Sequence, residues 1–193
     1  GGPASLPELP QRVREGARYS VTGLEELLDS YLGDTRLTAA LVDVVVTSYD
    51  LAYGEPVMLS SRTRSGYVSD VSMIAAARAT CAAPMFFKPQ VITDGDRERT
   101  LVDGGLCVSN PAVLGYLLGE QAATRAERPL VLVSLGTGTR PPRTPLSAAE
   151  AHMGDSYRAA RTLLEAVATG SGHLIHGLLT RLADGERFRY WRL

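Results

Sequence analysis

The sequence has little of several features that would mark a specialised class of protein. Its 193 residues include two cysteines, Cys81 and Cys107, with no Cys-x-x-Cys pair and no histidine at ligand spacing. This scarcity argues against a disulfide scaffold and against a structural zinc site. Only Lys88 is a lysine among 20 cationic residues, and the formal net charge is -1. Because nucleic-acid affinity depends on excess positive charge, we expect no nucleic-acid partner.

Long apolar runs are also absent, and no run approaches the length that a bilayer-spanning helix needs. What is present is 45% apolar residues, enough for one compact domain with a real core. Three prolines (Pro3, Pro7 and Pro10) occur early, and we expect residues 1–19 to be a connector and residues 20–193 to form the ordered part. No segment has the three parts of a signal peptide, so we expect a cytoplasmic location.

The hydrophobic pattern alternates between helical and extended segments. Thr22, followed by Glu25, predicts the start of a first helix, and Gly33 predicts its end. Asn110 and Pro111 predict the start of another helix. The remaining predicted helices cover residues 71–80, 157–168 and 173–182, and the predicted strands cover residues 41–47, 56–60, 100–102, 130–135 and 188–191. This alternation predicts an α/β protein, a three-layer sandwich with a mostly parallel central sheet.

Asp103 is the most informative residue for function, because it ends a short apolar strand and is followed by Gly104 and Gly105. In open α/β folds, the carboxyl edge of the sheet is where functional sites lie. Two glycines allow a sharp turn and leave room for a ligand or another backbone segment. The alternative is that Asp-Gly-Gly is only a turn, since Asp-Gly pairs are common in turns.

Other residue types that carry chemistry have weaker patterns. The glycine-rich loop 136–139 follows a predicted strand, but it lacks the Gly-Lys-Ser/Thr ending of a phosphate-binding loop, so a structural turn is the favoured interpretation. His152, His173 and His176 have no carboxylate partner at matching spacing. Cys81 lies among alanines, as expected of a small packed residue. We therefore expect no cofactor and no metal site.

Four segments in order carry a family resemblance. They are Thr47-Ser48-Tyr49-Asp50, Ala77-Arg78-Ala79-Thr80-Cys81-Ala82-Ala83-Pro84-Met85-Phe86-Phe87, Leu101-Val102-Asp103-Gly104-Gly105 with Asn110-Pro111 beyond it, and Val133-Ser134-Leu135-Gly136-Thr137-Gly138. This series resembles the C-terminal part of patatin-like phospholipases, the serine acyl hydrolases of plants and bacteria. Cys81 is a departure, since the family usually has serine there.

The resemblance implies a Ser–Asp dyad acting on phospholipids or other acyl esters. In the family, a serine in a Gly-x-Ser-x-Gly turn attacks the ester carbonyl, a glycine-rich loop supplies the oxyanion hole, and the aspartate of the Asp-Gly-Gly segment is the base. Carried onto this sequence, that base is Asp103, supported by Gly104 and Gly105. A carboxylate is a weak base for a hydroxyl, so partial desolvation and close contact with the serine are required.

The other half of this machinery is not in the sequence, which contains no Gly-x-Ser-x-Gly. We therefore expect the N-terminal strands and the nucleophile segment of the domain to be missing here, and the chain alone to be inactive. The rival interpretation is a non-catalytic, patatin-fold module that binds lipid or regulates a partner. A weaker rival is a nucleotide-binding domain that uses the loop 136–139. Core packing is the favoured interpretation of the apolar stripe at residues 174–182, and the alternatives are the lining of an acyl channel or transient contact with a membrane surface.

Overall fold

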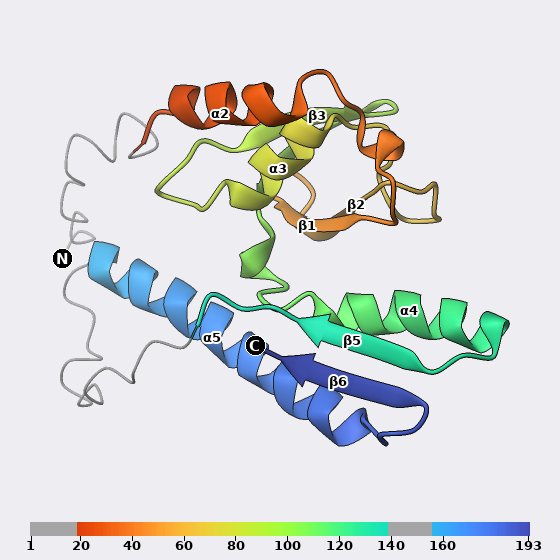
Figure 1. The fold of residues 1–193 in the computed structure, drawn as a ribbon. Helices are drawn as coiled ribbons and strands as arrows, with labels where there is room; N and C mark the ends of the chain where they lie inside the picture. Colours follow the sequence, from red (N-terminus) through yellow and green to blue (C-terminus); the bar gives the residue numbers. More distant parts are fainter. Residues whose placement is uncertain (1–18, 139–155) are drawn as a thin grey trace. The chain divides into compact units, whose positions relative to one another are not determined.

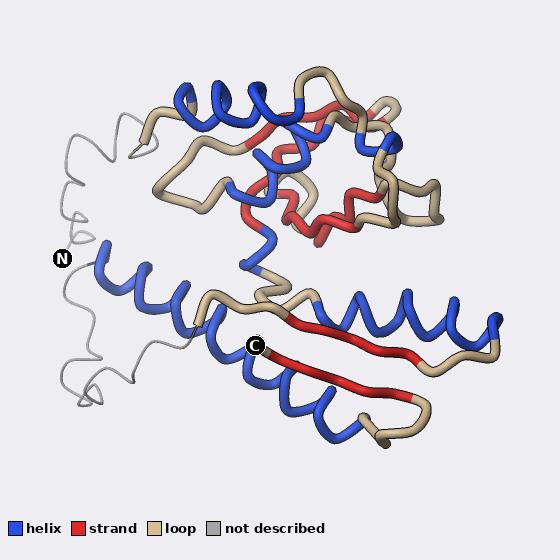
Figure 2. Tube along the Cα trace, viewed as in Figure 1, coloured by secondary structure: helices blue, strands red, loops and turns tan. Residues whose placement is uncertain are grey.

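The computed structural model describes residues 19–138 and 156–193, which fall into two compact units, Gly1–Cys107 and Val108–Leu193 (Figures 1 and 2). The helices are α2 (Thr22–Leu32), α3 (Met73–Cys81), α4 (Ala112–Ala126) and α5 (Ser156–Leu182), with short 3-10 turns η1 (Leu37–Ala39) and η2 (Gly104–Leu106). The strands are β1 (Val45–Asp50), β2 (Glu55–Ser60), β3 (Gln90–Asp94), β4 (Arg97–Asp103), β5 (Leu130–Ser134) and β6 (Phe188–Arg192). This mixture of helices and strands confirms the predicted α/β class.

The sheet of the first unit has the order β2-β1-β4-β3, and every neighbouring pair in it is antiparallel. The prediction of a mostly parallel sheet does not hold for these four strands, and the connections give the reason. Residues 51–54 join β1 to β2, and Gly95 and Asp96 alone join β3 to β4. Such short turns connect only antiparallel neighbours, because parallel strands need a long crossover. Parallel pairing occurs in the second unit instead.

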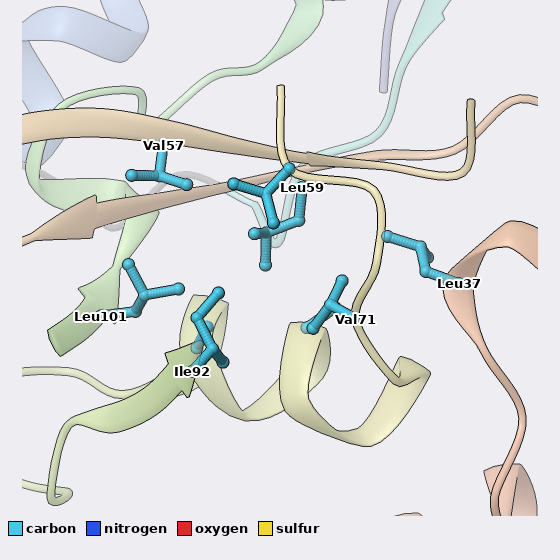
Figure 3. Packing of buried hydrophobic residues seen from close by; sticks show 9 residues of the cluster. Leu37, Val57, Leu59, Val71, Ile92 and Leu101 are labelled. Carbon is cyan, nitrogen blue, oxygen red and sulfur yellow. The ribbon is translucent and has the colours of Figure 1, made fainter. Parts of the chain in front are cut away.

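The core of the first unit lies between this sheet and helix α3 (Figure 3). Its buried side chains are Leu37, Val57, Leu59, Val68, Val71, Ala76, Ala79, Ile92 and Leu101. Ala76 and Ala79 are the members that belong to α3, and their small side chains let the helix backbone approach the strands closely. Ser72 caps this helix, since its Oγ accepts a hydrogen bond from the amide of Ala75 at 3.1 Å. The predicted helix over residues 71–80 is confirmed.

The second unit has one parallel pair of strands, β5 and β6, and helix α5 precedes β6 in the chain (Figure 1). Alternate residues along the strands face different surroundings. Leu130, Leu132 and Tyr190 pack against the core cluster, which is centred on Leu179 and Phe188. The residues between them, Val131, Val133 and Trp191, are exposed. The helix-facing side of this small sheet is therefore partly buried, and the opposite side, which also carries the exposed Arg189, is open to solvent.

Helix α5 is a single helix over Ser156–Leu182, whereas the sequence pattern predicted two helices separated near Gly170 and Gly172. Ser109 supplies the physical reason, because its hydroxyl donates to the carbonyl of Ala168 at 2.5 Å and lies 2.6 Å from Ser171 Oγ. A Cβ at Gly172 would already be 3.4 Å from the same hydroxyl. Ser171 and Gly172 thus leave room for Ser109 to pack against α5 without a break in the helix.

Several element boundaries differ from the predicted ones. Strand β1 begins at Val45, not at residue 41, and Leu41 and Val42 are exposed. The prediction of Thr22 as the residue that caps helix α2 together with Glu25 is wrong, because Thr22 is the first helical residue and Val21 precedes it without a side-chain cap. Ser20 Oγ accepts a hydrogen bond from the Thr22 amide at 3.2 Å instead. Strand β3 was not predicted at all. Gly33 at the end of α2 is confirmed as the C-cap residue.

Candidate active site

Asp103 is the last residue of β4, an inner strand of the four-stranded sheet. It pairs with Ser48 of β1, so the aspartate lies beside the interior of a neighbouring strand rather than at a frayed sheet corner. Ser48 is fully buried, and its hydroxyl donates a hydrogen bond of 2.6 Å to the carbonyl of Val102. This bond fixes the strand immediately before the aspartate.

The backbone and one carboxylate oxygen of Asp103 are held in place. Its amide donates to the carbonyl of Ala82 at 3.1 Å, which ties the strand end to the end of α3. Its Oδ1 accepts a hydrogen bond from the Gly105 amide at 2.7 Å. The side chain is half-buried, and no residue that the structure describes donates a hydrogen bond to Oδ2. The carboxylate thus closes a local turn through Oδ1, as the turn interpretation predicted.

Gly104 is required by close packing of two backbones. A Cβ at this position would lie 2.3 Å from the carbonyl oxygen of Thr47 and 2.4 Å from its Oγ1. A Cβ at Gly105 would lie 3.0 Å from Oδ1 of Asp103. Side chains at these two positions would displace the turn from β1 and crowd the carboxylate, respectively. Both glycines therefore support the geometry of Asp103, although this does not itself test a catalytic role.

Cys107 is the residue that follows the 3-10 turn η2. Its Sγ lies 3.4 Å from the carbonyl oxygen of Gly104 and 3.8 Å from that of Ser48, distances that suit weak S–H hydrogen bonds. Sequence reasoning gave no role to Ser48 or Cys107. Ser48 stood in one of the quoted family segments, and the spacing of Cys107 from Asp103 carried no recognisable pattern.

Cys81 lies at the end of α3 with its thiol exposed. Burial of part of the group raises the pKa of the Cys81 thiol, and the nearby Asp103 carboxylate raises that pKa further, while Arg78 opposes both. Asp103 is therefore close enough for its negative charge to disfavour the thiolate form of Cys81. The prediction of Cys81 as a packed interior residue is wrong, because the helix ends there and the next residue, Ala82, takes the buried position.

Arg78 is a buried cation in the same helix. It is 2% exposed, and its Nε donates to Glu25 at 3.2 Å while Nη2 donates to the carbonyl of Lys88 at 3.3 Å. Within the described ranges, Nη1 has no hydrogen-bond partner. The Glu25 ion pair attaches α2 to α3, and it gives Arg78 a structural part in holding the helix whose end contacts Asp103.

A second group of charges surrounds Asp50, the last residue of β1 and two positions after Ser48. Asp50 is fully buried and accepts hydrogen bonds from the Thr100 amide at 3.1 Å and from Arg99 Nη1 at 3.2 Å. Arg99 also bonds Glu55 and Asp94 at 2.8 Å each. These bonds, with Glu55 as the largest cause, raise the pKa of Arg99. Every described member is paired, so this group stabilises the sheet across β1, β2, β3 and β4.

The remaining sequence candidates do not form a site in the described residues. The amide of Gly136 donates to the carbonyl of Leu193 at 3.0 Å, so it is engaged by the backbone rather than offered to a phosphate. His176 Nδ1 lies 3.2 Å from the hydroxyl of Tyr190, and His173 is exposed. His152 and Thr139 lie outside the described residues. No cluster of three or more metal-ligating side chains occurs in residues 19–138 and 156–193.

Comparison with known proteins decides the family. The family model described as "Patatin-like phospholipase" matches residues 5–115, more than half of the chain. The chain belongs to the patatin-like phospholipase family. Patatin-like protein 2 of Arabidopsis thaliana is 31% identical over 140 residues, which cover 64% of this chain and 34% of the relative.

Further patatin relatives agree with this membership. Patatin-17 of Solanum cardiophyllum is 31% identical over 141 residues, or 64% of this chain and 36% of its own length. Patatin-like protein 1 of Arabidopsis thaliana is 30% identical over 153 residues, or 70% of this chain and 37% of its own length. The chain thus spans about a third of the length of these patatin-like relatives.

Proposed function

We propose that the protein to which this chain belongs hydrolyses acyl esters of phospholipids or lysophospholipids through a Ser–Asp dyad with Asp103 as the base. The observation that supports this most strongly is the hydrogen-bonding state of the aspartate. Its Oδ1 is occupied by the Gly105 amide, its backbone is tied to Ala82, and its half-buried carboxylate forms no salt bridge with any described residue. A carboxylate held this way has a fixed orientation and is not paired with a cation.

In this mechanism the serine hydroxyl donates to the carboxylate of Asp103. As the serine oxygen attacks the ester carbonyl carbon, its proton passes to the carboxylate, and Asp103 then gives that proton to the departing alcohol. A water molecule then attacks the carbonyl carbon of the acyl-serine and loses a proton to Asp103. The bond between the acyl carbon and the serine oxygen breaks, Asp103 returns the proton to the serine oxygen, and the fatty acid is released. His176 Nδ1 lies beside the hydroxyl of Tyr190, and neither described histidine is hydrogen-bonded to a described carboxylate, which is compatible with a dyad.

The serine is proposed to come from a segment outside these 193 residues, since the sequence has no Gly-x-Ser-x-Gly. The chain on its own is accordingly expected to hydrolyse neither p-nitrophenyl esters nor phosphatidylcholine. A longer polypeptide from the same reading frame, carrying a Gly-x-Ser-x-Gly turn and a glycine-rich loop ahead of residue 1, is expected to hydrolyse both.

The decisive experiment is Asp103→Asn in that longer polypeptide. Asparagine keeps the size and one oxygen acceptor for the Gly105 amide but cannot take the proton, so kcat is expected to fall about 10²–10⁴-fold while the melting temperature stays near that of the parent. Asp96→Asn is the matched control, because Asp96 is an exposed aspartate in the β3–β4 turn of the same unit. Full activity in Asp103→Asn would reject the assignment of the base.

A non-catalytic lipid-binding or regulatory module is the second candidate, and the absence of the serine motif from this chain favours it. A reading frame without any Gly-x-Ser-x-Gly turn would select the module over the enzyme. Lipid binding together with a complete lack of ester hydrolysis in the longest polypeptide would also select the module.

A further inference from the structure

The short segment that follows helix α3 lies between the buried Arg78 and the candidate base. It begins at Ala82, whose carbonyl accepts the hydrogen bond from the Asp103 amide at 3.1 Å. It ends at Lys88, whose carbonyl accepts the bond from Nη2 of Arg78 at 3.3 Å. We call residues 82–88 the α3 exit segment. Asp103 and Arg78 are therefore bonded to its two opposite ends.

The α3 exit segment contains strained backbone. Met85 has a φ of +71°, in the left-handed region that residues with a side chain rarely adopt. The amides of Phe86 and Phe87 both donate to the carbonyl of Ala83 at 3.0 Å, so the chain turns tightly here. A strained residue persists only where the surrounding structure holds it. The hydrogen bond at Lys88 supplies one such hold, at the far end of the segment.

Stability alone does not account well for a buried arginine at position 78. The Arg78 side chain is 2% exposed, whereas Glu25, the described carboxylate that pairs with its Nε, is 48% exposed. Nη1 has no hydrogen-bond partner in the part of the chain that the structure describes. Burying a charge is costly, and replacing a buried ion pair by apolar side chains is often neutral or stabilising. The guanidinium is therefore expected to contribute geometry more than stability.

We propose that Arg78 is a positioning residue for Asp103 and acts through the α3 exit segment. The proposal rests on the proposed function, in which Asp103 is the base. The planar guanidinium bonds Glu25 and Lys88 from two different nitrogens, which fixes the far end of the segment relative to α2 and α3. Without these bonds the strained segment relaxes, Ala82 moves, and the end of β4 moves with it. A base displaced by about 1 Å transfers protons far more slowly.

The thiol of Cys81 reports this geometry in the 193-residue chain without any enzyme activity. Cys81 ends α3 directly before the segment, and the Asp103 carboxylate raises the pKa of its thiol. The quantity to measure is the change in this pKa caused by Asp103→Asn, from iodoacetamide labelling rates across pH in a Cys107→Ser background. The direct effect of Arg78, which lowers the thiol pKa, cancels because Asp103→Asn is compared within each background.

Arg78→Met is the test variant, because methionine is long and apolar and both former partners, Glu25 and Lys88, belong to exposed residues that water can reach. Its melting temperature is expected to stay within about 5 °C of the parent. The change in the Cys81 pKa caused by Asp103→Asn is expected to fall to about half or less, since the two groups move apart. Arg97→Met is the matched control, because it removes an exposed arginine of the same unit, and it is expected to keep the full change.

Two results would overturn the proposal. One is an undiminished change of the Cys81 pKa in the Arg78→Met background. The other is no change in the parent, because the end of α3 and Asp103 would then not be held together. If Arg78→Met does not fold, Arg78→Lys takes its place, since lysine keeps the charge but lacks the two separate nitrogens. A reduced change in folded Arg78→Lys supports the proposal, and a full change overturns it.

Kinetics of the longer polypeptide separate this proposal from the proposed function. Arg78→Met is expected to lower kcat about tenfold or more and to leave KM within about twofold, because a displaced base slows proton transfer without altering substrate binding. An unchanged kcat would overturn the positioning role. Full activity of Asp103→Asn would instead reject the base, and a reduced Cys81 effect in Arg78→Met would still show that Arg78 fixes the position of Asp103.

Discussion

The two units of this chain bury their sheets to different extents. In the first unit, the fully buried Leu59 and Leu101 belong to β2 and β4 and join a cluster that includes two alanines of α3. In the second unit, one side of the β5–β6 pair packs on helices, and the other side exposes Val133 and Trp191 by 53% and 61%. The first unit therefore holds Asp103 beside a closely packed core, whereas the second unit leaves one side of its strand pair exposed to solvent.

The largest expected effect contrasts one leucine from each unit. Leu59→Ala removes a fully buried side chain and is expected to lower the free energy of unfolding by about 2–5 kcal/mol. Leu135→Ala, at 75% exposure directly after β5, is expected to change it by less than about 0.5 kcal/mol. Urea unfolding of both variants measures the difference. Equal destabilisation by Leu59→Ala and Leu135→Ala would contradict the difference in burial between the two units.

The next effect concerns the turn that carries the candidate base. Gly104→Ala places a methyl group where the Thr47 carbonyl oxygen lies 2.3 Å away, so the turn must move from β1. We expect a loss of about 1–3 kcal/mol in the free energy of unfolding. Gly138→Ala, a glycine with no neighbouring atom within 4 Å of its Cβ, tests the effect of backbone strain alone, since its φ is +91°. A destabilisation of Gly104→Ala below that of Gly138→Ala would contradict the close-packing explanation.

A smaller effect is expected at the strand before Asp103. Ser48→Ala removes the hydrogen bond to the Val102 carbonyl inside the buried sheet and is expected to cost about 1 kcal/mol. Ser65→Ala removes an exposed serine hydroxyl and is the control, with a change expected below about 0.5 kcal/mol. Thermal unfolding of both variants tests whether the sheet next to the candidate base depends on this buried hydroxyl.

The proximity of Asp103 to Cys81 is testable without any enzyme activity. Because the Asp103 carboxylate raises the pKa of the Cys81 thiol, Asp103→Asn is expected to lower that pKa and to speed alkylation of Cys81 at pH 8 a few-fold. The measurement is iodoacetamide labelling as a function of pH in a Cys107→Ser background. Asp96→Asn is the control and should leave the rate unchanged. An unchanged alkylation rate in Asp103→Asn would show that the Asp103 carboxylate does not affect the pKa of the Cys81 thiol.

The last prediction concerns acid sensitivity of the second unit. Asp184 Oδ1 accepts hydrogen bonds from the amides of Phe188, Glu186 and Arg187, and these bonds lower its pKa below the ordinary value of 3.8, with the Phe188 bond as the largest cause. A lowered carboxyl pKa stabilises the fold above pH 3.8 and loses that contribution as the pH falls through the lower folded value. We expect Asp184→Asn to flatten this acid limb in a pH series of melting temperatures. An identical acid limb in the variant would contradict the expectation.

The sequence predicted local features well and pairings poorly. Asp103-Gly104-Gly105 was located correctly at a strand end, because a short apolar strand followed by glycines is a local pattern. Strand β3 was missed because Gln90 and Thr93 interrupt its apolar character, although Asp94-Gly95 is a recognisable hairpin signal. Antiparallel pairing follows from such turns, and a pattern of strands alone does not specify it.

Long-range contacts lay further beyond the sequence. Arg99 reaches Asp50 across 49 positions, and no periodicity indicates that a buried carboxylate on one strand is paired from another. Helix α5 continues unbroken past Gly170 and Gly172, where the hydroxyl of Ser109 contacts it. Ser109 lies 59 positions before Ala168, whose carbonyl accepts its hydrogen bond. The roles of Asp103, Gly104 and Gly105 as a catalytic base and its supports stay predictions, since the structure describes their geometry and not a reaction.

The tight contact at Gly104 has an evolutionary consequence. The nearest obstacle to a side chain there is a main-chain oxygen of residue 47, an atom that every amino acid possesses. Shortening the side chain at position 47 would remove the threonine hydroxyl but leave this oxygen, so no second-site change at that position can compensate. In a randomised library, position 104 should be strongly enriched in glycine, whatever residue accompanies it at 47.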